Sequence, residues 1–426
     1  MAICFLAIAS SKAQNYPQRS NVLWITEPDH KNWLYHVDEE AKVAVSLYEF
    51  GIPVDDVEIS YSVGPEMLPA DTEGTATLKD GKAEISLGSS PEPGFRDCWF
   101  RAELNGQTYK HHVKVGFEPE KLEPYTQYPD DFVSFWKEAK AEAAECPMLV
   151  EKEFVPEFSS NEVDCYLVKI QTYQKGQQVY GYLTIPKKEG KFPVVFAPPG
   201  AGIKPMDPMK HIFYAESGVI RFDMEIHGIR PNLDRKTYDE ISRSFGNGDN
   251  GYLVNGLDNL DNYYMKKVYM SCVRALDFLT TLPEWDGKNL IAQGGSQGGA
   301  LALITTGLDD RITACAANHP ALSDMAGYLG NRAGGYPHLN RFNHMLTPEK
   351  VKVLQYYDVV NFAKLIDVPV FMTWGYNDNV CPPTTSYIVY NTLDTQKEAY
   401  ITPINEHWVS EKTRRVILDW IKSKVK

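Results

Sequence analysis

The stretch Leu290–Ala300 restricts the fold of this chain more than any other. A short apolar run leads into Gly294-Gly-Ser-Gln-Gly-Gly299, and a helix-like segment over 300–308 follows directly. This order is typical of a nucleophile elbow, the tight strand-to-helix turn that presents a serine at the carboxyl edge of a parallel sheet. Gly294 and Gly298 would keep side chains out of the crossing, and the helix N-terminus would direct its free N–H groups at an oxyanion.

Short apolar runs alternate with helical segments after about residue 190, which is the pattern of a parallel sheet with helices on both faces. The runs lie at 194–197, 218–222, 290–291, 312–317 and 368–374. Two longer strands, 163–172 and 178–185, precede them and are joined by a turn at Lys175-Gly176. Together with the elbow, this pattern predicts an α/β-hydrolase fold over residues 128–426.

The preceding region, 15–118, has a period of two, as half-buried strands have. Asp80-Gly81 and Asn105-Gly106 each lie between such runs and predict hairpins. We therefore expect a small all-β, immunoglobulin-like sandwich over 15–118. Residues 119–127 are rich in proline and acids and predict a linker, and a helix should follow over 129–140.

The first 14 residues carry an apolar run, Ala2–Ala9, and end on small residues, as a secretory signal does. A basic start is missing, so a buried N-terminal strand is the alternative. The segment predicts export, to the periplasm or the medium. No other stretch approaches the length of a membrane span, so stable membrane insertion is not expected.

The formal net charge of -13 argues against nucleic acid as a partner and favours a neutral or cationic substrate. Six cysteines follow the predicted signal without C-x-x-C spacing, and no H-E-x-x-H pattern occurs. We therefore expect neither a metal nor another cofactor. Disulfides are permitted by the even number, but buried free thiols are the commoner arrangement for cysteines in apolar stretches.

A nucleophilic serine needs a histidine to accept its proton and an acid to orient that histidine, and in this fold they follow in the order serine, acid, histidine. Four histidines come after Ser296, and of these only His407 lies beyond the strand that follows residue 395. Asp378 directly follows the 368–374 strand, where the acid belongs. Its competitors are Asp358, Asp367 and Asp394, which precede this strand or follow a later helix.

The oxyanion of the reaction needs backbone N–H donors. One should come from Gln297, directly after the serine, and the other from Ala201, in the loop Pro198-Pro-Gly-Ala-Gly202 that follows a sheet strand. The segments 231–260 and 323–346 are expected to rise over the site. Tyr252 and Tyr336 in these segments are candidates for binding the substrate.

Several motifs resemble those of the acetyl xylan esterase and cephalosporin C deacetylase family of carbohydrate esterases. The motifs are Gly295-Ser-Gln-Gly-Gly299, Tyr357-Asp-Val-Val-Asn361, Gly375-Tyr-Asn-Asp-Asn-Val-Cys-Pro-Pro383, His319-Pro-Ala-Leu-Ser-Asp324, Tyr263-Tyr264 and Asp286. The resemblance covers about residues 128–425 and leaves out the predicted sandwich.

The resemblance implies a serine esterase that removes acetyl groups from xylo-oligosaccharides or related small acetyl esters, with Ser296, Asp378 and His407 as the triad. It also makes a homo-oligomer a candidate state, because the family forms ring-shaped hexamers. The chain departs from the family at two places. Ala201 replaces the tyrosine of the oxyanion loop, and His227-Gly228-Ile229 replaces an Arg-Gly-Gln signature.

Two other functions stay open at this point. A peptidase of the prolyl-oligopeptidase type also joins a β domain to an α/β-hydrolase, although 15–118 is too short for a propeller. Gln297 after the serine favours the esterase. A degenerate hydrolase that only binds glycans is the third hypothesis, and the intact order of serine, acid and histidine argues against it.

Overall fold

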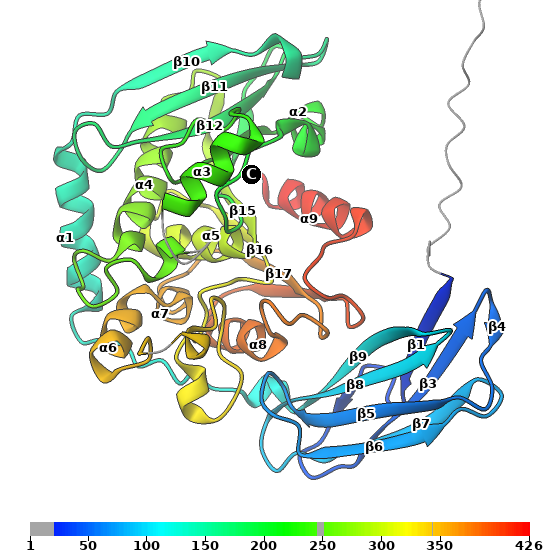
Figure 1. Ribbon diagram of the computed structural model, residues 1–426. Coiled ribbons are helices and arrows are strands. Elements are labelled where there is room, and N and C mark those ends of the chain that lie inside the picture. The colour runs from blue at the N-terminus through cyan, green and yellow to red at the C-terminus, as the bar shows by residue number, and fades with distance from the viewer. Residues whose placement is uncertain (1–20, 245–250, 343) are drawn as a thin grey trace, which may run out of the picture.

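The computed structural model describes residues 21–244, 251–342 and 344–426, and the predicted signal segment 1–14 lies outside them. The chain forms a β domain near its N-terminus and a larger part in which helices surround one mixed sheet (Figure 1). The β domain lies beside α8 (Pro383–Thr392) of the larger part.

Two sheets form the β domain. One contains β1 (Val22–Pro28), β3 (Ala41–Glu49), β4 (Ile52–Pro53) and β7 (Lys82–Gly88), and the other contains β2 (Leu34–Tyr35), β9 (Gln107–Phe117), β8 (Gly94–Leu104), β5 (Glu58–Pro65) and β6 (Thr72–Thr77). Residues at alternate positions along much of β3, β7 and β8, among them Val43, Val45 and Phe100, are buried in a core that both sheets share. The period-two pattern therefore has the cause that we expected, one buried and one exposed face for each sheet.

The two predicted hairpins have different outcomes. Asn105-Gly106 forms the turn between β8 and β9, whose ladder ends with Leu104 opposite Gln107. Asp80-Gly81 also has two positive φ angles, but it closes only the bridge between Lys79 and Lys82. The prediction of a full hairpin is wrong there, because β6 pairs with β5 in one sheet and β7 with β3 in the other. The immunoglobulin-like class of the domain stays a prediction.

The larger part is built on one sheet of nine strands. In spatial order these are β10 (Val150–Phe154), β11 (Val163–Gln171), β12 (Gln178–Pro186), β14 (Ile220–Met224), β13 (Phe192–Ala197), β15 (Trp285–Gly295), β16 (Ala314–Asn318), β17 (Val370–Trp374) and β18 (Lys397–Ile401). The first three strands are antiparallel to their neighbours, and the remaining pairs are parallel. This arrangement confirms the predicted α/β-hydrolase fold.

Both faces of this sheet are covered, which explains why its central strands are mostly apolar. Val194 and Phe196 of β13 face the main core, whereas Val195 of the same strand faces a second core. The helices are α1 (Phe132–Glu145), α2 (Phe213–Glu216), α3 (Arg235–Ser244), α4 (Tyr264–Leu279), α5 (Gln297–Leu308), α6 (Pro348–Tyr357), α7 (Val359–Ala363), α8 and α9 (Glu411–Lys424). Residues of α1, α4, α5, α7 and α8 belong to the main core, and residues of α2 and α9 belong to the second. In the described part of the chain, no helix is long and apolar enough to span a bilayer.

The segment predicted as a linker is held in place. It begins with a short 3-10 helix, η1 (Pro119–Lys121), and the backbone N–H groups of Tyr125 and Thr126 then donate to the buried carboxylate of Asp324. Asp358, also buried, accepts from the Thr126 hydroxyl. Burial and the nearby Asp324 charge raise the pKa of Asp358 to about 7.

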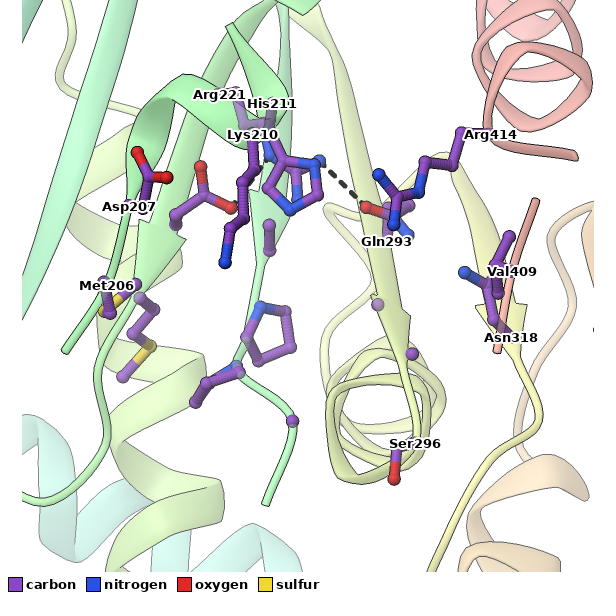
Figure 2. A pocket seen from close by; sticks show the side chains of 18 of the residues that line it. Met206, Asp207, Lys210, His211, Arg221, Gln293, Ser296, Asn318, Val409 and Arg414 are labelled. Atoms are coloured by element: carbon purple, nitrogen blue, oxygen red, sulfur yellow. Dashed lines mark hydrogen bonds and ion pairs between the residues drawn. The ribbon is translucent and has the colours of Figure 1, made fainter. Parts of the chain in front are cut away.

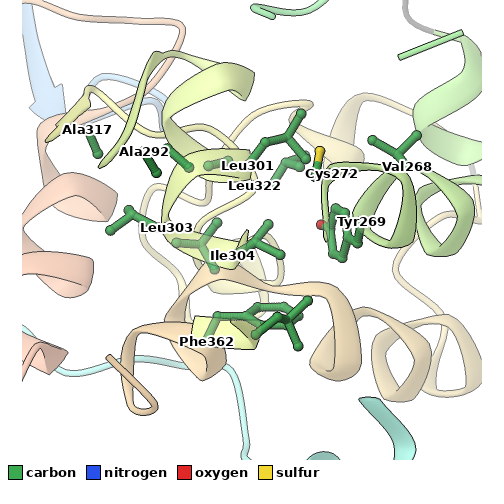
Figure 3. Packing of buried hydrophobic residues seen from close by; sticks show 14 of the residues in the cluster. Val268, Tyr269, Cys272, Ala292, Leu301, Leu303, Ile304, Ala317, Leu322 and Phe362 are labelled. Carbon is green, nitrogen blue, oxygen red and sulfur yellow. The ribbon is translucent and has the colours of Figure 1, made fainter. Parts of the chain in front are cut away.

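Helix α5 is buried on every side, between α4 and α7 (Figure 3). Ile304 has no exposed surface. We expect Ile304→Ala to lower the free energy of unfolding by about 2–5 kcal/mol, because it leaves a cavity in a close-packed core. Denaturant unfolding followed by tryptophan fluorescence measures this change. Val133→Ala on the exposed face of α1 is the control, with an expected change within about 0.5 kcal/mol, and equal effects of the two would contradict the packing.

The six cysteines of the described residues are all buried free thiols. This is the arrangement that the sequence analysis favours over disulfides. They are Cys98, Cys146, Cys165, Cys272, Cys315 and Cys381. Burial raises the pKa of Cys165, Cys272 and Cys315 to about 12. These thiols therefore stay protonated and unreactive in the folded chain.

Candidate active site

Ser296 occupies a strained turn between β15 and α5. Its φ and ψ are 58° and -126°, a backbone conformation that L-residues rarely adopt. A Cβ at Gly294 would lie 2.2 Å from the carbonyl oxygen of Gly298, and one at Gly298 would lie 2.4 Å from that of Pro198. The two glycines are therefore required for the strand, the helix and the neighbouring loop to approach one another, as the sequence predicts.

The structure brings Ser296, His407 and Asp378 together from the ends of β15, β18 and β17. His407 Nε2 lies 3.0 Å from Ser296 Oγ, and His407 Nδ1 lies 2.7 Å from Asp378 Oδ2. The other carboxylate oxygen of Asp378 accepts N–H bonds from Val380 and Cys381. Burial opposes ionisation of Asp378, but the hydrogen bond and charge of His407 outweigh it and hold the pKa below its usual value. The carboxylate is thus ionised and ready to stabilise an imidazolium.

The competing acids lie elsewhere. Asp358 caps the N-terminus of α7, where its side chain accepts from Val360 N–H. Asp367 and Asp394 are exposed. Asp378 is therefore the carboxylate that bonds the histidine of this site.

Two further side chains lie beside the triad, and both belong to motifs named above to which the sequence analysis gave no role at the site. The ring of His319 lies 4.4 Å from that of His407, measured between centroids, and burial together with His407 lowers the pKa of His319 to about 4. His319 is therefore neutral near pH 7 and does not repel a protonated His407. The buried Cys381 thiol interacts with the Ser296 hydroxyl. Motif order identifies a triad, but it does not show which side chains pack against it.

His319, Asp378 and His407 are also the one group of potential metal ligands that the described residues bring together. Asp378 and His407 are already bonded to each other in this group. The hydrogen bonds fit a proton relay, and the expectation that no metal takes part stays a prediction.

Gln297 and the loop 198–202 meet at the predicted oxyanion site. Gln297 is the first residue of α5 and is completely buried. Gly200 faces Gly295, with 3.7 Å between an ideal Cβ of Gly200 and the Gly295 carbonyl oxygen. The backbone of Ala201 therefore lies near the elbow, and its role as second donor stays a prediction.

Tyr252 does not have the position that the sequence-based prediction gave it. It is completely buried, so it cannot form the wall of an open sugar site. Its hydroxyl donates to Gln297 Oε1 at 2.6 Å and accepts from the Gly202 N–H at 3.3 Å. Tyr252 therefore ties the oxyanion loop to the first residue of α5. This role was hidden because Tyr252 is far from both partners along the chain.

Tyr252→Phe should lower kcat by about 10- to 100-fold with little change in KM, because it loosens the oxyanion loop without touching the sugar site. It also leaves the Gln297 acceptor unpaired in a buried place, at a cost of about 1–3 kcal/mol in unfolding free energy. Steady-state kinetics on an aryl acetate tests this. Tyr109→Phe is the control, since that hydroxyl bonds Gln107 in the β domain. A rise in KM alone would return Tyr252 to the substrate site.

Tyr336 is half-buried, and its carbonyl accepts from the Leu322 N–H close to the elbow. Its role in substrate binding stays a prediction. The expected covering segments, 231–260 and 323–346, include residues 245–250 and 343, which lie outside the described residues. His227, at the place of the family arginine, packs against Tyr252 and bonds the hydroxyl of Tyr264.

A cavity of about 520 Å³ adjoins the triad and is lined by Ser296, His319 and His407. It continues along the sheet face toward α2 and α9, where Lys210, Arg221 and Arg414 line it (Figure 2). Figure 2 shows Ser296 at one end and these cations toward the other. The space is large enough for a small oligosaccharide.

Residues 118–424 match the family described as "Acetyl xylan esterase (AXE1)". The chain belongs to the acetyl xylan esterase family. This confirms the resemblance found in the motifs and places the chain among carboxylic ester hydrolases.

The chain is similar in sequence to an acetyl esterase and in fold to acetyl xylan esterases of known structure. The chain is 56% identical over 421 residues to "Acetyl esterase Axe7A" of Xylanibacter ruminicola, covering 99% of this chain and 94% of that one. An acetyl xylan esterase from Paenibacillus sp. R4 is 25% identical, with a TM-score of 0.64 over 72% of this chain and 99% of its own. Acetyl xylan esterase 1 from Thermoanaerobacterium sp. JW/SL YS485 is 24% identical, with a TM-score of 0.64 over 72% of this chain and 98% of its own.

Proposed function

We propose that this chain is a serine esterase that removes O-acetyl groups from xylo-oligosaccharides or related acetylated carbohydrates through an acetyl-enzyme intermediate. The observation that carries the proposal is the hydrogen-bonded order Ser296, His407, Asp378 in a member of the acetyl xylan esterase family. The names of the relatives, acetyl esterase and acetyl xylan esterase, support the acetyl group and the xylan.

In this mechanism, His407 Nε2 accepts the Ser296 proton while Oγ attacks the acetyl carbonyl carbon. The Gln297 and Ala201 N–H groups donate to the oxyanion of the tetrahedral intermediate. The intermediate collapses, the C–O bond to the sugar breaks, and the sugar oxygen receives the proton from His407. A water molecule, deprotonated by His407, then attacks the acetyl-enzyme, and acetate leaves as Ser296 regains its proton. Asp378 holds the Nδ1 proton of His407 throughout.

Acetate release from acetylated xylo-oligosaccharides tests this function directly. We expect release of acetate and no cleavage of an acyl-prolyl amide. Amide cleavage without acetate release would favour the peptidase, and neither activity would favour a glycan-binding protein. In the same assay Tyr336→Ala should raise KM for the oligosaccharide but not for an aryl acetate, if Tyr336 contacts the sugar.

Export is part of the proposal and is supported by the apolar run at residues 2–9. The N-terminal sequence of the protein recovered from expressing cells tests it. Cleavage near Ala13 is expected, and an intact N-terminus on all recovered protein would contradict export through this segment.

A further inference from the structure

The β domain contacts the loop that carries the catalytic acid through a buried lysine. Lys114 of β9 has no exposed surface. Its ammonium group donates to the carbonyl oxygen of Asp378 at 2.7 Å and to Glu66 Oε1 at 2.6 Å. Its backbone N–H donates to the Asn377 side chain, which in turn bonds the Ile404 carbonyl in the loop before His407.

A second contact lies next to the first. His112 of β9 is held by Asp97 at 3.0 Å, and its ring stacks on Trp99. His112 Nε2 faces both Asn379, at 3.4 Å, and Glu406, at 3.6 Å. Asn379 directly follows the catalytic acid, Asp378, and Glu406 directly precedes the catalytic base, His407. The β domain therefore contacts both loops of the triad.

A buried ion pair is a costly way to join two domains, because each charge loses its hydration. Burial raises the pKa of Glu66, and the Lys114 charge offsets part of that rise. Apolar side chains would pack this contact at lower cost, but they could not donate to the Asp378 carbonyl. We propose that Lys114, paired with Glu66, is a positioning residue of the triad, so that the β domain sets the placement of Asp378 against His407.

This proposal rests on the proposed serine mechanism, and a charge-neutral double variant tests it. Lys114→Met alone leaves Glu66 charged and unpaired, which can unfold the chain, whereas Lys114→Met with Glu66→Met removes both charges. We expect the double variant to keep its melting temperature within a few degrees while kcat on an aryl acetate falls by about 10²-fold and KM changes less than twofold. The acid limb of the kcat profile should also move to lower pH, because the imidazolium loses part of its carboxylate partner.

The matched control is Lys121→Met, which removes an exposed lysine paired with Glu118. Its kinetics should equal those of the wild type. An active, stable double variant with unchanged kcat and pH profile would overturn the proposal and leave the pair as a packing contact. Failure of the proposed function is a different result, since the wild type itself would then release no acetate.

A different observation concerns the far end of the catalytic cavity. Its lining includes Lys204, Lys210, Arg221 and Arg414 but only two carboxylates, Asp207 and Asp223. Arg221 pairs with Asp223, whereas Lys204, Lys210 and Arg414 form no ion pair within the described residues. This cavity is thus locally cationic in a chain whose formal net charge is -13.

The cations are close enough to affect one another. Burial and the charge of Lys210 lower the pKa of Lys204. Burial and the charges of Arg221, Arg414 and Lys210 lower the pKa of His211, in the same lining, to about 2. An anion in the cavity would relieve this repulsion. We propose that the far end of the cavity binds a carboxylate of the substrate, so that acetylated oligosaccharides carrying a uronic acid are preferred over neutral ones.

This second proposal deepens the proposed function. We expect Lys210→Gln with Arg414→Gln to raise KM about tenfold for an acetylated xylo-oligosaccharide with a uronic acid branch, and to leave the neutral oligosaccharide unchanged. Arg415→Gln is the control, because Arg415 follows on α9 but pairs with Glu411. Equal KM values of the wild type for the two substrates would overturn the proposal.

A binding experiment separates this site from catalysis. Ser296→Ala, titrated calorimetrically with the deacetylated acidic oligosaccharide at fixed ionic strength, should bind it more tightly than the neutral one. Sodium sulfate at the same ionic strength shows whether any anion competes equally. Equal competition, or equal affinity for both oligosaccharides, would contradict a site for a sugar carboxylate.

Discussion

Replacing Ser296 with alanine should lower kcat for acetate release by about 10⁶-fold, because the oxygen that forms the acetyl-enzyme is lost. KM should change little, since the cavity walls remain. The elbow also carries backbone strain, at a φ of 58°, and alanine has the same Cβ as serine, so stability should be close to that of the wild type. Acetate release and aryl acetate hydrolysis measure the effect.

Ser134→Ala is the control for this experiment, because its hydroxyl bonds a backbone carbonyl at the start of α1. Its activity should be normal. Residual esterase activity of Ser296→Ala near that of the wild type would exclude the serine mechanism. The same variant is then useful as an inactive protein for binding studies.

Asp378→Asn should lower kcat by about 10⁴-fold. The asparagine would donate to His407 Nδ1 where the carboxylate now accepts, which leaves the proton on Nε2 and removes the acceptor that faces Ser296 Oγ. The variant also lacks the negative charge of the wild-type carboxylate, whose pKa the pairing with His407 holds below its usual value, so the imidazolium formed during the reaction is no longer stabilised. Presteady-state release of the aryl alcohol measures acylation directly.

Asp394→Asn gives the comparison, since Asp394 is the exposed acid that follows α8 and competed for the role in the sequence. It should be as active as the wild type. If Asp394→Asn and Asp378→Asn lost activity to the same extent, the hydrogen bond between Asp378 and His407 would not be the basis of the relay.

The features that could be predicted from the sequence are those set by neighbouring residues or by the order of motifs along the chain. Ser296 lies in a motif whose glycines have a steric cause, and His407 is the one histidine that follows the last strand. Local turn chemistry placed Asn105-Gly106 in a hairpin. The same chemistry failed at Asp80-Gly81, because pairing of the strands is decided by long-range packing of two sheets.

The remaining features depend on contacts between distant parts of the chain. Tyr252 reaches Gln297, and Lys114 reaches Asp378 across 264 positions. Neither residue belongs to a motif, and each looks in the sequence like an ordinary loop tyrosine or strand lysine. The positive lining of the cavity was hidden as well, since the chain as a whole is acidic and led us to expect a neutral or cationic substrate.

The reactivity of the buried thiols can be used to test whether each variant described above is folded. Since the six cysteines of the described residues are enclosed and burial raises the pKa of most of them, a thiol reagent should react with these six only in chains that open. Reactivity of the native protein then reports the population of open states, without any substrate. A variant that loses catalysis while its thiols stay protected has lost alignment, and one whose thiols become reactive has lost structure.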